Sequence, residues 1–325
     1  MAGIEVLILA AESMGVRSMA TKVTTPDVSI MIDAGASLGP RFGLQPHPLE
    51  YGALSESRRR IREASEGCEV MVVTHYHHDH YSPPFDNDYI WTWSDRKVAE
   101  ELYRDKVVII KDPREDINFS QRVRAYHLAN FLEGISREVR VADSASLQFG
   151  ETRVGFSEPV FHGEEGSRLG YVLMVHVESG DRSFLFASDV QGPISERTKA
   201  LIMGMGASTI FVGGPPTYLH PSQMATDVIA RAIRNLSDIC ERTGLTIVDH
   251  HLMRALDWRK SVMEAEIKAR SAGNDLVSAA SFSGRKEDLL EARRERLYED
   301  IPPGNDFISW TRKRYEERRK TPPPL

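Results

Sequence analysis

Cysteine is scarce in this chain of 325 residues: Cys68 and Cys240 are the only two, and neither belongs to a Cys-x-x-Cys pair. Thiolate zinc sites use such pairs, and small secreted proteins depend on several cysteines joined in disulfides. The sequence therefore indicates neither a cysteine-sealed metal site nor a disulfide framework. A reducing cytoplasm is the expected location.

Long hydrophobic runs are also missing. The first segment, MAGIEVLILAAESMG, has a short apolar run, but Glu5 and Glu12 flank it and no basic residue precedes it. A membrane-spanning helix needs about 20 consecutive apolar residues, and a secretory signal needs a basic start. We therefore expect no membrane partner and no secretion.

Phosphate-binding loops and dense basic patches are missing as well. No GxGxxG or GxxxxGK[ST] motif leads from a predicted strand into a helix. The formal net charge is −6, and the most basic segments, RRRIRE and WTRKRYEERRKT, contain interleaved acids. Mixed charges are typical of salt-bridged helix faces, whereas nucleic-acid binding depends on clustered Lys and Arg. A nucleic-acid substrate is therefore possible but not favoured.

The apolar pattern predicts an α/β fold. Strand-like runs occur at 6–11, 29–35, 70–74, 106–112, 208–214 and 245–251, with further short strands between 139 and 190. Helical patterns occur at 55–67, 94–105, 118–134, 196–203 and 222–243, with Ser55 and Ser222 as N-terminal signals and Gly67 and Gly134 as C-terminal signals. A Thr25-Pro26-Asp27 turn signal between the first two runs suggests an opening antiparallel hairpin. Alternation around a β-rich middle favours two sheets packed face to face with helices outside.

One domain is expected to span the whole chain. Its core would cover about 4–252, followed by a charged helical extension at about 255–318 and a tail at 319–325. Leu289, Leu290, Leu297 and Tyr298 have amphipathic spacing that fits packing on the core. We expect the extension to cover a sheet edge or to serve a homo-oligomer.

One histidine cluster stands out against this ordinary background. The stretch THYHHDHYSPP, 74–84, directly follows a predicted strand and holds four of the eleven histidines. Side chains two apart in an extended segment point the same way, so His75 and His77 can share one ion. Asp79 and His80, beyond a turn, can bind a second ion. Ser82 is predicted to cap the first turn of a following helix.

The alternative is a polar loop without metal. Buried imidazoles are costly without partners, and such a loop has no need to concentrate them. Further candidates follow other apolar runs: His162 in PVFHG, Asp189 in LFASDV, and His250 and His251 in TIVDHH. Their recurrence where strands end predicts one metal centre. Without cysteine the centre stays open to water and substrate, as catalytic sites do.

These residues resemble a known family. The run from His75 to His80 is similar to the HxHxDH signature of the metallo-β-lactamase superfamily, and the later candidates follow in the superfamily's order, after Asp33 in MIDAG. The resemblance spans about 4–252 and implies a four-layer αββα sandwich of two mixed sheets flanked by helices. It implies the following ligands: His75, His77 and His162 for one ion, Asp79, His80 and His250 for the other, and Asp189 as the bridge. Asp33 would then be structural, and His78 would occupy a variable position.

The choice between His250 and His251 stays open from the residues alone, because alternation along a strand cannot decide it. The segment HHLMR resembles the HFSxR segment of the transfer-RNA 3′-processing ribonuclease branch, which favours His250. The redox branch carries glutamate at the position of His77, so the resemblance points away from it.

The predicted function is metal-dependent hydrolysis. Two divalent ions, zinc by preference and manganese or iron otherwise, lower the pKa of a shared water. We assign catalytic roles to Asp79, which orients the water, and to Asp189, which holds the bridge. The substrate would be a small ester or a phosphoester; a nuclease and a non-catalytic metal-binding protein are the alternatives. No organic cofactor is indicated.

Substrate contacts are less specific. Tyr218 and His220 lie between the Asp189 and His250 motifs and are candidates for a general acid, although a rigid turn before a helix is as good an explanation. Arg114, Arg122 and Arg124 could form a lid over an anionic substrate, and a solvated helix start is the alternative.

Overall fold

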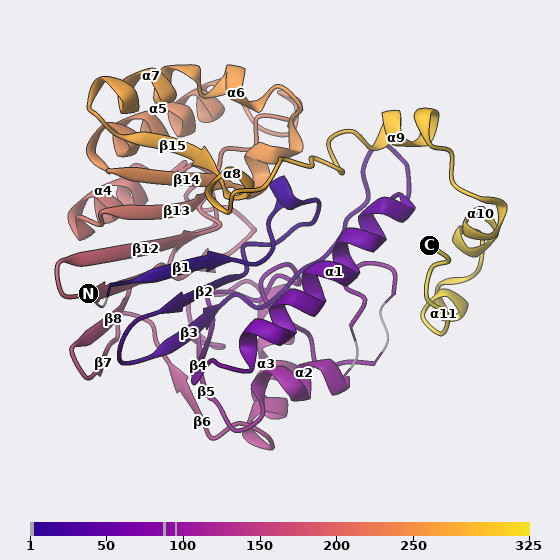
Figure 1. Ribbon diagram of the computed structural model, residues 1–325, viewed down its shortest axis with the longest axis horizontal. Helices are drawn as coiled ribbons and strands as arrows, with labels where there is room; N and C mark the ends of the chain where they lie inside the picture. The colour runs from indigo at the N-terminus through magenta and orange to yellow at the C-terminus, as the bar shows by residue number, and fades with distance from the viewer. Residues whose placement is uncertain (1–2, 87–88, 95) are drawn as a thin grey trace.

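Two β-sheets lie face to face at the centre of the molecule (Figure 1). The computed structural model describes residues 3–86, 89–94 and 96–325. Within these residues the first sheet has the order β1 (Glu5–Ile8), β2 (Thr21–Thr24), β3 (Ser29–Ile32), β4 (Val70–Val73), β5 (Val107–Ile110) and β6 (Glu138–Val141). The second has the order β15 (Asp275–Ser278), β14 (Leu245–Asp249), β13 (Thr209–Gly213), β12 (Arg182–Ser188), β11 (Val175–Ser179), β8 (Thr152–Phe156) and β7 (Ser146–Phe149). A separate pair consists of β9 (Val160–Phe161) and β10 (Tyr171–Val172).

Both sheets are mixed. In the first, β1 to β3 are antiparallel, and β3 to β6 are parallel. In the second, β12 to β15 are parallel. Strand β11 pairs antiparallel with β12, β8 pairs antiparallel with β11, and β7 pairs antiparallel with β8. The expected opening hairpin is a three-stranded antiparallel arrangement, and the Thr25-Pro26-Asp27 turn joins β2 to β3.

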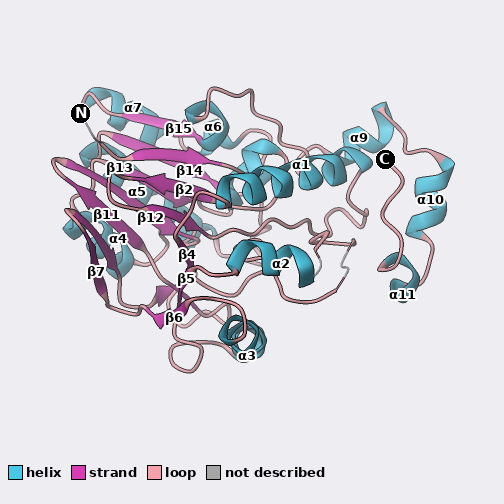
Figure 2. Cartoon of the chain, turned by 60° about the horizontal axis from the view of Figure 1, so that its bottom comes forward, coloured by secondary structure: helices cyan, strands magenta, loops and turns pink. Residues whose placement is uncertain are grey.

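Helices cover the outer face of each sheet (Figure 2). The first sheet is covered by α1 (Pro48–Ser65), α2 (Arg96–Tyr103) and α3 (Phe119–Glu133). The second is covered by α4 (Glu196–Met205), α5 (Thr226–Arg242) and α7 (Met263–Ser271). Shorter helices are η1 (Glu12–Met14), η2 (His250–Arg254), α6 (Trp258–Ser261), α8 (Ala279–Phe282), α9 (Arg294–Asp300), α10 (Asn305–Thr311) and α11 (Tyr315–Arg318).

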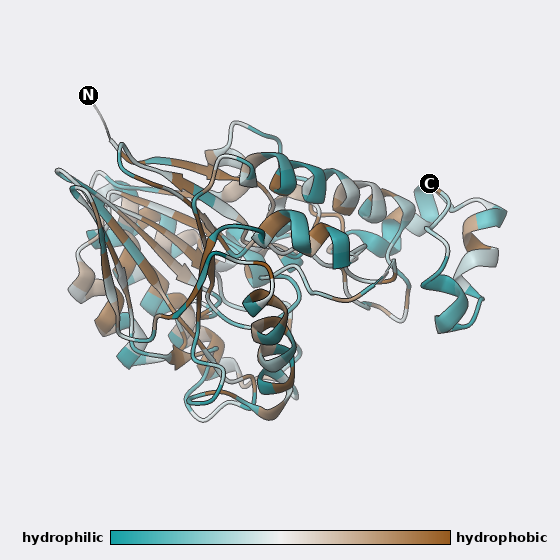
Figure 3. Cartoon of the chain, turned by 90° about the horizontal axis from the view of Figure 1, so that it is seen from below, coloured by the Kyte–Doolittle hydropathy of each residue, from teal (hydrophilic) through white to brown (hydrophobic). Residues whose placement is uncertain are grey.

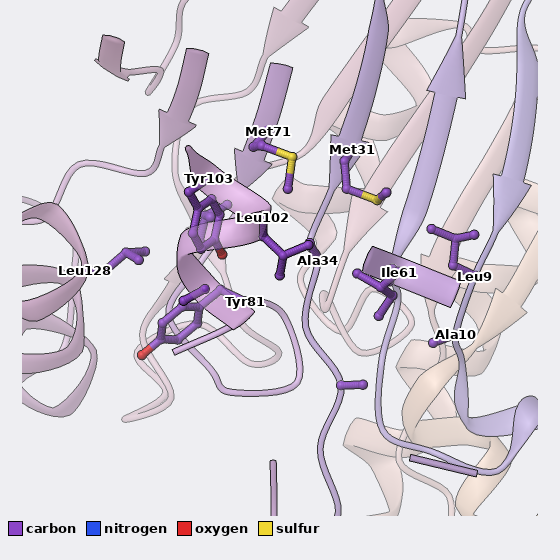
Figure 4. Close-up of a cluster of buried hydrophobic side chains, with 14 of the residues drawn as sticks. Leu9, Ala10, Met31, Ala34, Ile61, Met71, Tyr81, Leu102, Tyr103 and Leu128 are labelled. Atoms are coloured by element: carbon purple, nitrogen blue, oxygen red, sulfur yellow. The ribbon is translucent and has the colours of Figure 1, made fainter. Parts of the chain in front are cut away.

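Strand side chains alternate between two apolar layers. In β4, Val70 and Val72 face the other sheet, whereas Met71 and Val73 face the helices. In β12, Phe184 and Phe186 face the first sheet. Figure 4 shows Met31 and Met71 among side chains from α1 and α2, and Figure 3 shows the apolar colouring of the strands between mixed helices. Each such buried side chain contributes roughly 2 kcal/mol of transfer free energy. The predicted four-layer αββα sandwich is confirmed.

Several predicted helix boundaries are wrong. Helix α1 begins at Pro48 instead of near Ser55, because His47 accepts a hydrogen bond from the Leu49 N–H while the Glu50 carboxylate accepts one from the His47 N–H. This is a capping box in which histidine takes the place of the usual Ser or Thr. Helix α5 begins at Thr226, not Ser222.

Ser82 does not act as a helix cap in the described part of its segment. Its hydroxyl donates to the Ala34 carbonyl at 2.8 Å, and its N–H donates to the Tyr103 hydroxyl at 3.2 Å. The exit of the histidine loop is therefore tied to the β3 turn and to α2.

The C-terminal region packs on the sandwich and also contributes β15, a strand that the sequence pattern did not indicate. Leu290 and Leu297 are buried, and the Tyr298 hydroxyl donates to the Gln45 carbonyl. Phe307 and Trp310 close on Tyr51, with ring centroids 5.9 and 5.6 Å from it. Of the helices that the structure describes, none has both the length and the apolar character to cross a membrane.

Candidate metal centre

Loops at the ends of four strands converge at one edge of the sandwich. Asp33 follows β3, Thr74 follows β4, Ser188 ends β12 and His250 follows β14. The Thr74 and Ser188 hydroxyl oxygens lie 2.8 Å apart and connect the two sheets here. Asp33, Ser188 and His250 have positive φ angles of 50°, 59° and 59°. Such angles cost about 1 to 3 kcal/mol each for residues other than glycine, and they are concentrated at functional sites.

A first group of candidate ligands contains three histidines and one aspartate. One potential ligand atom from each of His75, His77, His162 and Asp189 lies within 4.8 Å of the others. The His77 ring centroid is 4.8 Å from those of both His75 and His162. His162 Nε2 is 2.7 Å from Asp189 Oδ2. Residues far apart in the sequence are thus brought to one point.

A second group adjoins the first. Asp79, His80 and His250 have potential ligand atoms within 4.8 Å of one another. His250 Nε2 lies 3.7 Å from Asp79 Oδ2 and 3.2 Å from Asp189 Oδ2. The Asp189 carboxylate therefore lies between the two groups, in contact with His162 on one side and with His250 on the other.

Asp33 anchors the histidine loop, residues 74–84, by contacts with Thr74 and His80. Its carboxylate accepts hydrogen bonds from the Thr74 N–H at 2.8 Å and the Thr74 hydroxyl at 2.7 Å, and it lies 2.7 Å from His80 Nδ1. This contact leaves Nε2 of His80 directed elsewhere. Gly35 allows the close approach, because a Cβ there would lie 2.2 Å from the Tyr81 nitrogen. Asp33 thus has the bracing position expected from the sequence.

Glu12, in η1 after β1 of the first sheet, contacts the Nδ1 atom of His250 as Asp33 contacts that of His80. Its Oε2 lies 3.0 Å from His250 Nδ1, and its Oε1 forms an ion pair with Arg254. Burial alone would raise the pKa of Glu12, but Arg254 and His250 outweigh burial and lower the pKa to about 2. An ionised Glu12 favours a proton on Nδ1 of His250 and leaves Nε2 for the cluster.

The side chains present fit a divalent metal ion. Nε2 of His75 and of His80, and Oδ1 of Asp189, are buried and have no hydrogen-bond partner among the described residues. An unsatisfied buried polar atom costs about 1 to 3 kcal/mol, which metal coordination would remove. Imidazole combined with carboxylate is the donor set of zinc, manganese and iron.

The electrostatics favour metal-binding protonation states at four members of the cluster but not at His250. Burial and the neighbouring histidines lower the pKa of His75 and of His77 well below the ordinary value, so both are neutral at neutral pH. Burial raises the pKa of Asp79 and of Asp189, but the surrounding histidines outweigh it and hold both pKa values far below the usual range. Neutral imidazoles and ionised carboxylates are the forms that bind metal. Burial would lower the pKa of His250, but the Glu12 and Asp189 carboxylates outweigh it and raise this pKa well above its ordinary value, so a metal ion would have to displace a proton there.

His251 occupies a different position from His250. Its Nε2 lies 3.2 Å from Asp189 Oδ2, so it also touches the bridge position. Its other face stacks on Tyr218, whose hydroxyl lies 3.3 Å from His251 Nδ1 and accepts a hydrogen bond from Arg254. The Gln191 amide nitrogen lies 3.5 Å from His251 Nε2. His251 therefore connects the candidate ligands to the polar side chains of Gln191 and Tyr218.

The remaining residues that the sequence singled out, among them the possible substrate contacts, lie at different distances from the candidate ligands. His78 turns away from the cluster and packs against Tyr81 and Phe85. Arg124 approaches the loop and donates to the Tyr76 carbonyl at 3.1 Å. Arg122 and Arg114 contact each other on the surface, and His220 contacts Ser222 at an exposed turn. Arg122 and Arg114 therefore do not form a lid with Arg124.

Glu12 and Gln191 were not among the sequence candidates. Glu12 follows the first apolar run, at the same sheet edge as the others, so its strand-end position was a usable signal. Gln191 follows Asp189 closely, and its amide nitrogen lies 3.4 Å from His162 Nδ1. Nothing in the local sequence distinguishes this glutamine from a surface residue.

Two mixed sheets, four layers and HxHxDH histidines at one sheet edge define the class of protein: the fold is that of the metallo-β-lactamase superfamily. The chain belongs to the UPF0282 family. A UPF0282 protein of Methanopyrus kandleri is 40% identical over 293 residues, which cover 90% of this chain and 98% of the relative. No family model matches the sequence.

Solved structures with a similar chain course include unliganded yeast PDE1, with a TM-score of 0.47 and 12% identity over 86% of this chain and 97% of that one. A metal-dependent hydrolase of the beta-lactamase superfamily has a TM-score of 0.47 and 11% identity, covering 86% of this chain and 96% of its own. The fold assignment above depends on the strand order of this chain itself.

Proposed function

We propose that the protein is a metal-dependent hydrolase with a dinuclear centre, zinc by preference, that acts on an ester or phosphoester. One observation carries the proposal: the Asp189 carboxylate lies between two groups of buried imidazoles, 2.7 Å from His162 Nε2 and 3.2 Å from His250 Nε2. Next to these contacts, His75 Nε2, His80 Nε2 and Asp189 Oδ1 are buried without a hydrogen-bond partner among the described residues, which is costly unless a cation binds there.

The ligands would divide as the two groups do. The first ion would be held by His75, His77 and His162, the second by Asp79, His80 and His250, with Asp189 shared between them. When bound, two divalent ions activate a water molecule and polarise the electrophilic oxygen of the substrate. Manganese and iron suit the same donors, so the metal has to be identified by analysis.

The residues of the chain orient the ligands and an entering water. Asp33 and Glu12 fix the rings of His80 and His250 through their Nδ1 atoms. The Asp79 side chain is 17% exposed, unlike the buried His250 beside it, so it can accept a hydrogen bond from an entering water. Its low pKa keeps it ionised for this role.

The preferred substrate class follows from the metal-site chemistry together with the net charge of the chain. A net charge of −6 disfavours a long polyanion, so a small ester or phosphoester is the preferred substrate. RNA or DNA cleavage and metal binding without turnover remain as measurable outcomes.

The decisive experiment combines metal analysis of the purified protein with a panel of phosphodiesters, thioesters, lactones and RNA. We expect about two ions per chain and metal-dependent turnover of one small-molecule class. Replacing His75 or Asp189 by Ala should remove metal and activity together. His220→Ala is the matched control, because it removes an exposed histidine outside the cluster.

Each alternative has its own signature in this experiment. Preferred turnover of RNA would indicate a nuclease. Two bound ions without turnover of any substrate would indicate a metal-binding protein. An Asp189→Ala variant with full metal content and full activity would contradict the proposed bridge.

A further inference from the structure

A cavity lies beside the histidine loop, between this loop and helix α3. It has a volume of about 550 Å³ and is lined by His78, Tyr81, Phe85, Arg124, Phe131 and neighbouring residues. This volume is within the usual range for small-molecule sites, roughly 300 to 1,000 Å³. The lining contains none of the eight candidate metal ligands. The cavity is therefore a separate feature from the metal centre.

One face of α3 forms much of the wall. Arg124, His127 and Phe131 recur at three- and four-residue spacing, which places them on one side of the helix. The opposite wall comes from the loop, where the His78 ring centroid lies 5.7 Å from that of Tyr81 and 5.6 Å from that of Phe85. Five planar ring side chains thus line this cavity.

Within the described residues, the cavity lining is positively charged and contains no compensating acid. Arg124 and Arg96 line it, and no carboxylate does so among the described residues. The Arg96 guanidinium already has two contacts, because its Nε lies 3.4 Å from Glu100 Oε1 and its Cζ lies 5.0 Å from the centroid of the Phe131 ring. Arg124 is half-buried, and its guanidinium donates to the Tyr76 carbonyl through one nitrogen. No ion pair to Arg124 occurs within the described residues, so its other donors can face a ligand.

We propose that this cavity binds a small organic anion, with its carboxylate or phosphate group on Arg124 and a flat apolar body against the half-buried rings of Phe85 and His78. A guanidinium presents paired donors that match either oxyanion, and the rings supply apolar contact for the body. The site is independent of turnover at the metal centre, so it does not depend on the proposed function.

The test uses phenylphosphonate, whose carbon–phosphorus bond a phosphoesterase does not cleave, in titration calorimetry with the metal-loaded protein. We expect saturable binding at millimolar concentration, weakened about tenfold or more in Arg124→Gln because a charge-assisted hydrogen-bond pair is lost. Arg122→Gln is the matched control: it removes the same charge from the exposed side of α3. It should change the affinity less than about twofold, as expected for a screened surface charge.

Two further variants separate the cavity from other sources of binding. Asp189→Asn alters the metal centre and should leave phenylphosphonate binding in place. Phe85→Ala should weaken phenylphosphonate severalfold but leave inorganic phosphate binding unchanged, because it removes only ring contact. This variant also decides the matter if Arg124→Gln does not fold.

Three results would overturn the proposal. The first is the absence of saturable binding. The second is an equal loss in Arg122→Gln and Arg124→Gln, which would indicate a general charge effect. The third is loss of binding in Asp189→Asn with none in Phe85→Ala, which would place the anion at the metal centre.

Discussion

Glu12 Oε2 lies 3.0 Å from Nδ1 of His250, although one residue follows the first strand of the chain and the other follows β14 of the opposite sheet. The contact joins the two halves of the sandwich at the candidate metal centre. Arg254 completes the arrangement by pairing with the same carboxylate. A carboxylate behind a histidine fixes the ring and raises its basicity as a metal ligand.

Replacing Glu12 by Gln should therefore weaken metal binding while preserving size. We expect a loss of about 10- to 100-fold in affinity for one ion, the usual effect of removing a partner that orients a ligand. Competition with a chromogenic chelator measures this affinity. Glu5→Gln, an exposed change on β1, is the control. Unchanged affinity in Glu12→Gln would mean that the contact does not support a ligand.

His250 and His251 should respond differently to replacement by alanine. His250 belongs to the group formed with Asp79 and His80. Among the groups that the described residues form, His251 occurs only in the one with Asp189 and His250. Neither Asp79 nor His80 belongs to that group. We expect His250→Ala to lose about one metal ion per chain, and His251→Ala to keep both, since a ligand set tolerates loss of a neighbour better than loss of a ligand. Metal content by mass spectrometry decides this, and the reverse pattern would reassign the ligand.

The sequence predicted the architecture because the signals that define it are local. Strands such as Val70–Val73 are continuous apolar runs, and the four-layer fold follows from their alternation with helices. The HxHxDH spacing is also local, so one segment supplied several candidates at once. Ligand roles for these residues remain predictions, although their side chains lie together.

The parts that were missed depend on contacts between distant segments or on uncommon local solutions. Glu12 gains its position only when η1 meets η2. The start of α1 depends on a histidine cap, and histidine is not among the usual capping residues. Strand β15 is four residues long and forms by pairing with β14, so its sequence carries little strand signal of its own.

Tyr218, a candidate general acid from the sequence, contacts both His251 and Arg254 in the structure. Its hydroxyl contacts His251 Nδ1 and accepts from Arg254, and its ring lies under the Arg41 guanidinium at 4.5 Å. Tyr218→Phe keeps the ring but removes the hydroxyl. We expect the turnover number to fall about 10- to 100-fold with metal content unchanged, in the range for loss of a general acid or of a positioned hydrogen bond. Tyr171→Phe, outside the cluster, is the control; equal activity of Tyr218→Phe and wild type would exclude the role.

The Arg294–Glu50 pair should anchor the C-terminal region to the core. The two side chains are 0% and 1% exposed, and the guanidinium donates to both carboxylate oxygens at 2.7 and 2.8 Å. Arg294→Ala would leave Glu50 buried without its partner, which typically costs about 3 to 5 kcal/mol of unfolding free energy. Denaturant unfolding measures the loss, and Arg296→Ala on the exposed side of the same helix should cost less than about 0.5 kcal/mol. Glu50→Gln combined with Arg294→Met should recover part of the loss, because no uncompensated charge remains. Similar stability of Arg294→Ala and Arg296→Ala would show that the extension is held by apolar contacts alone.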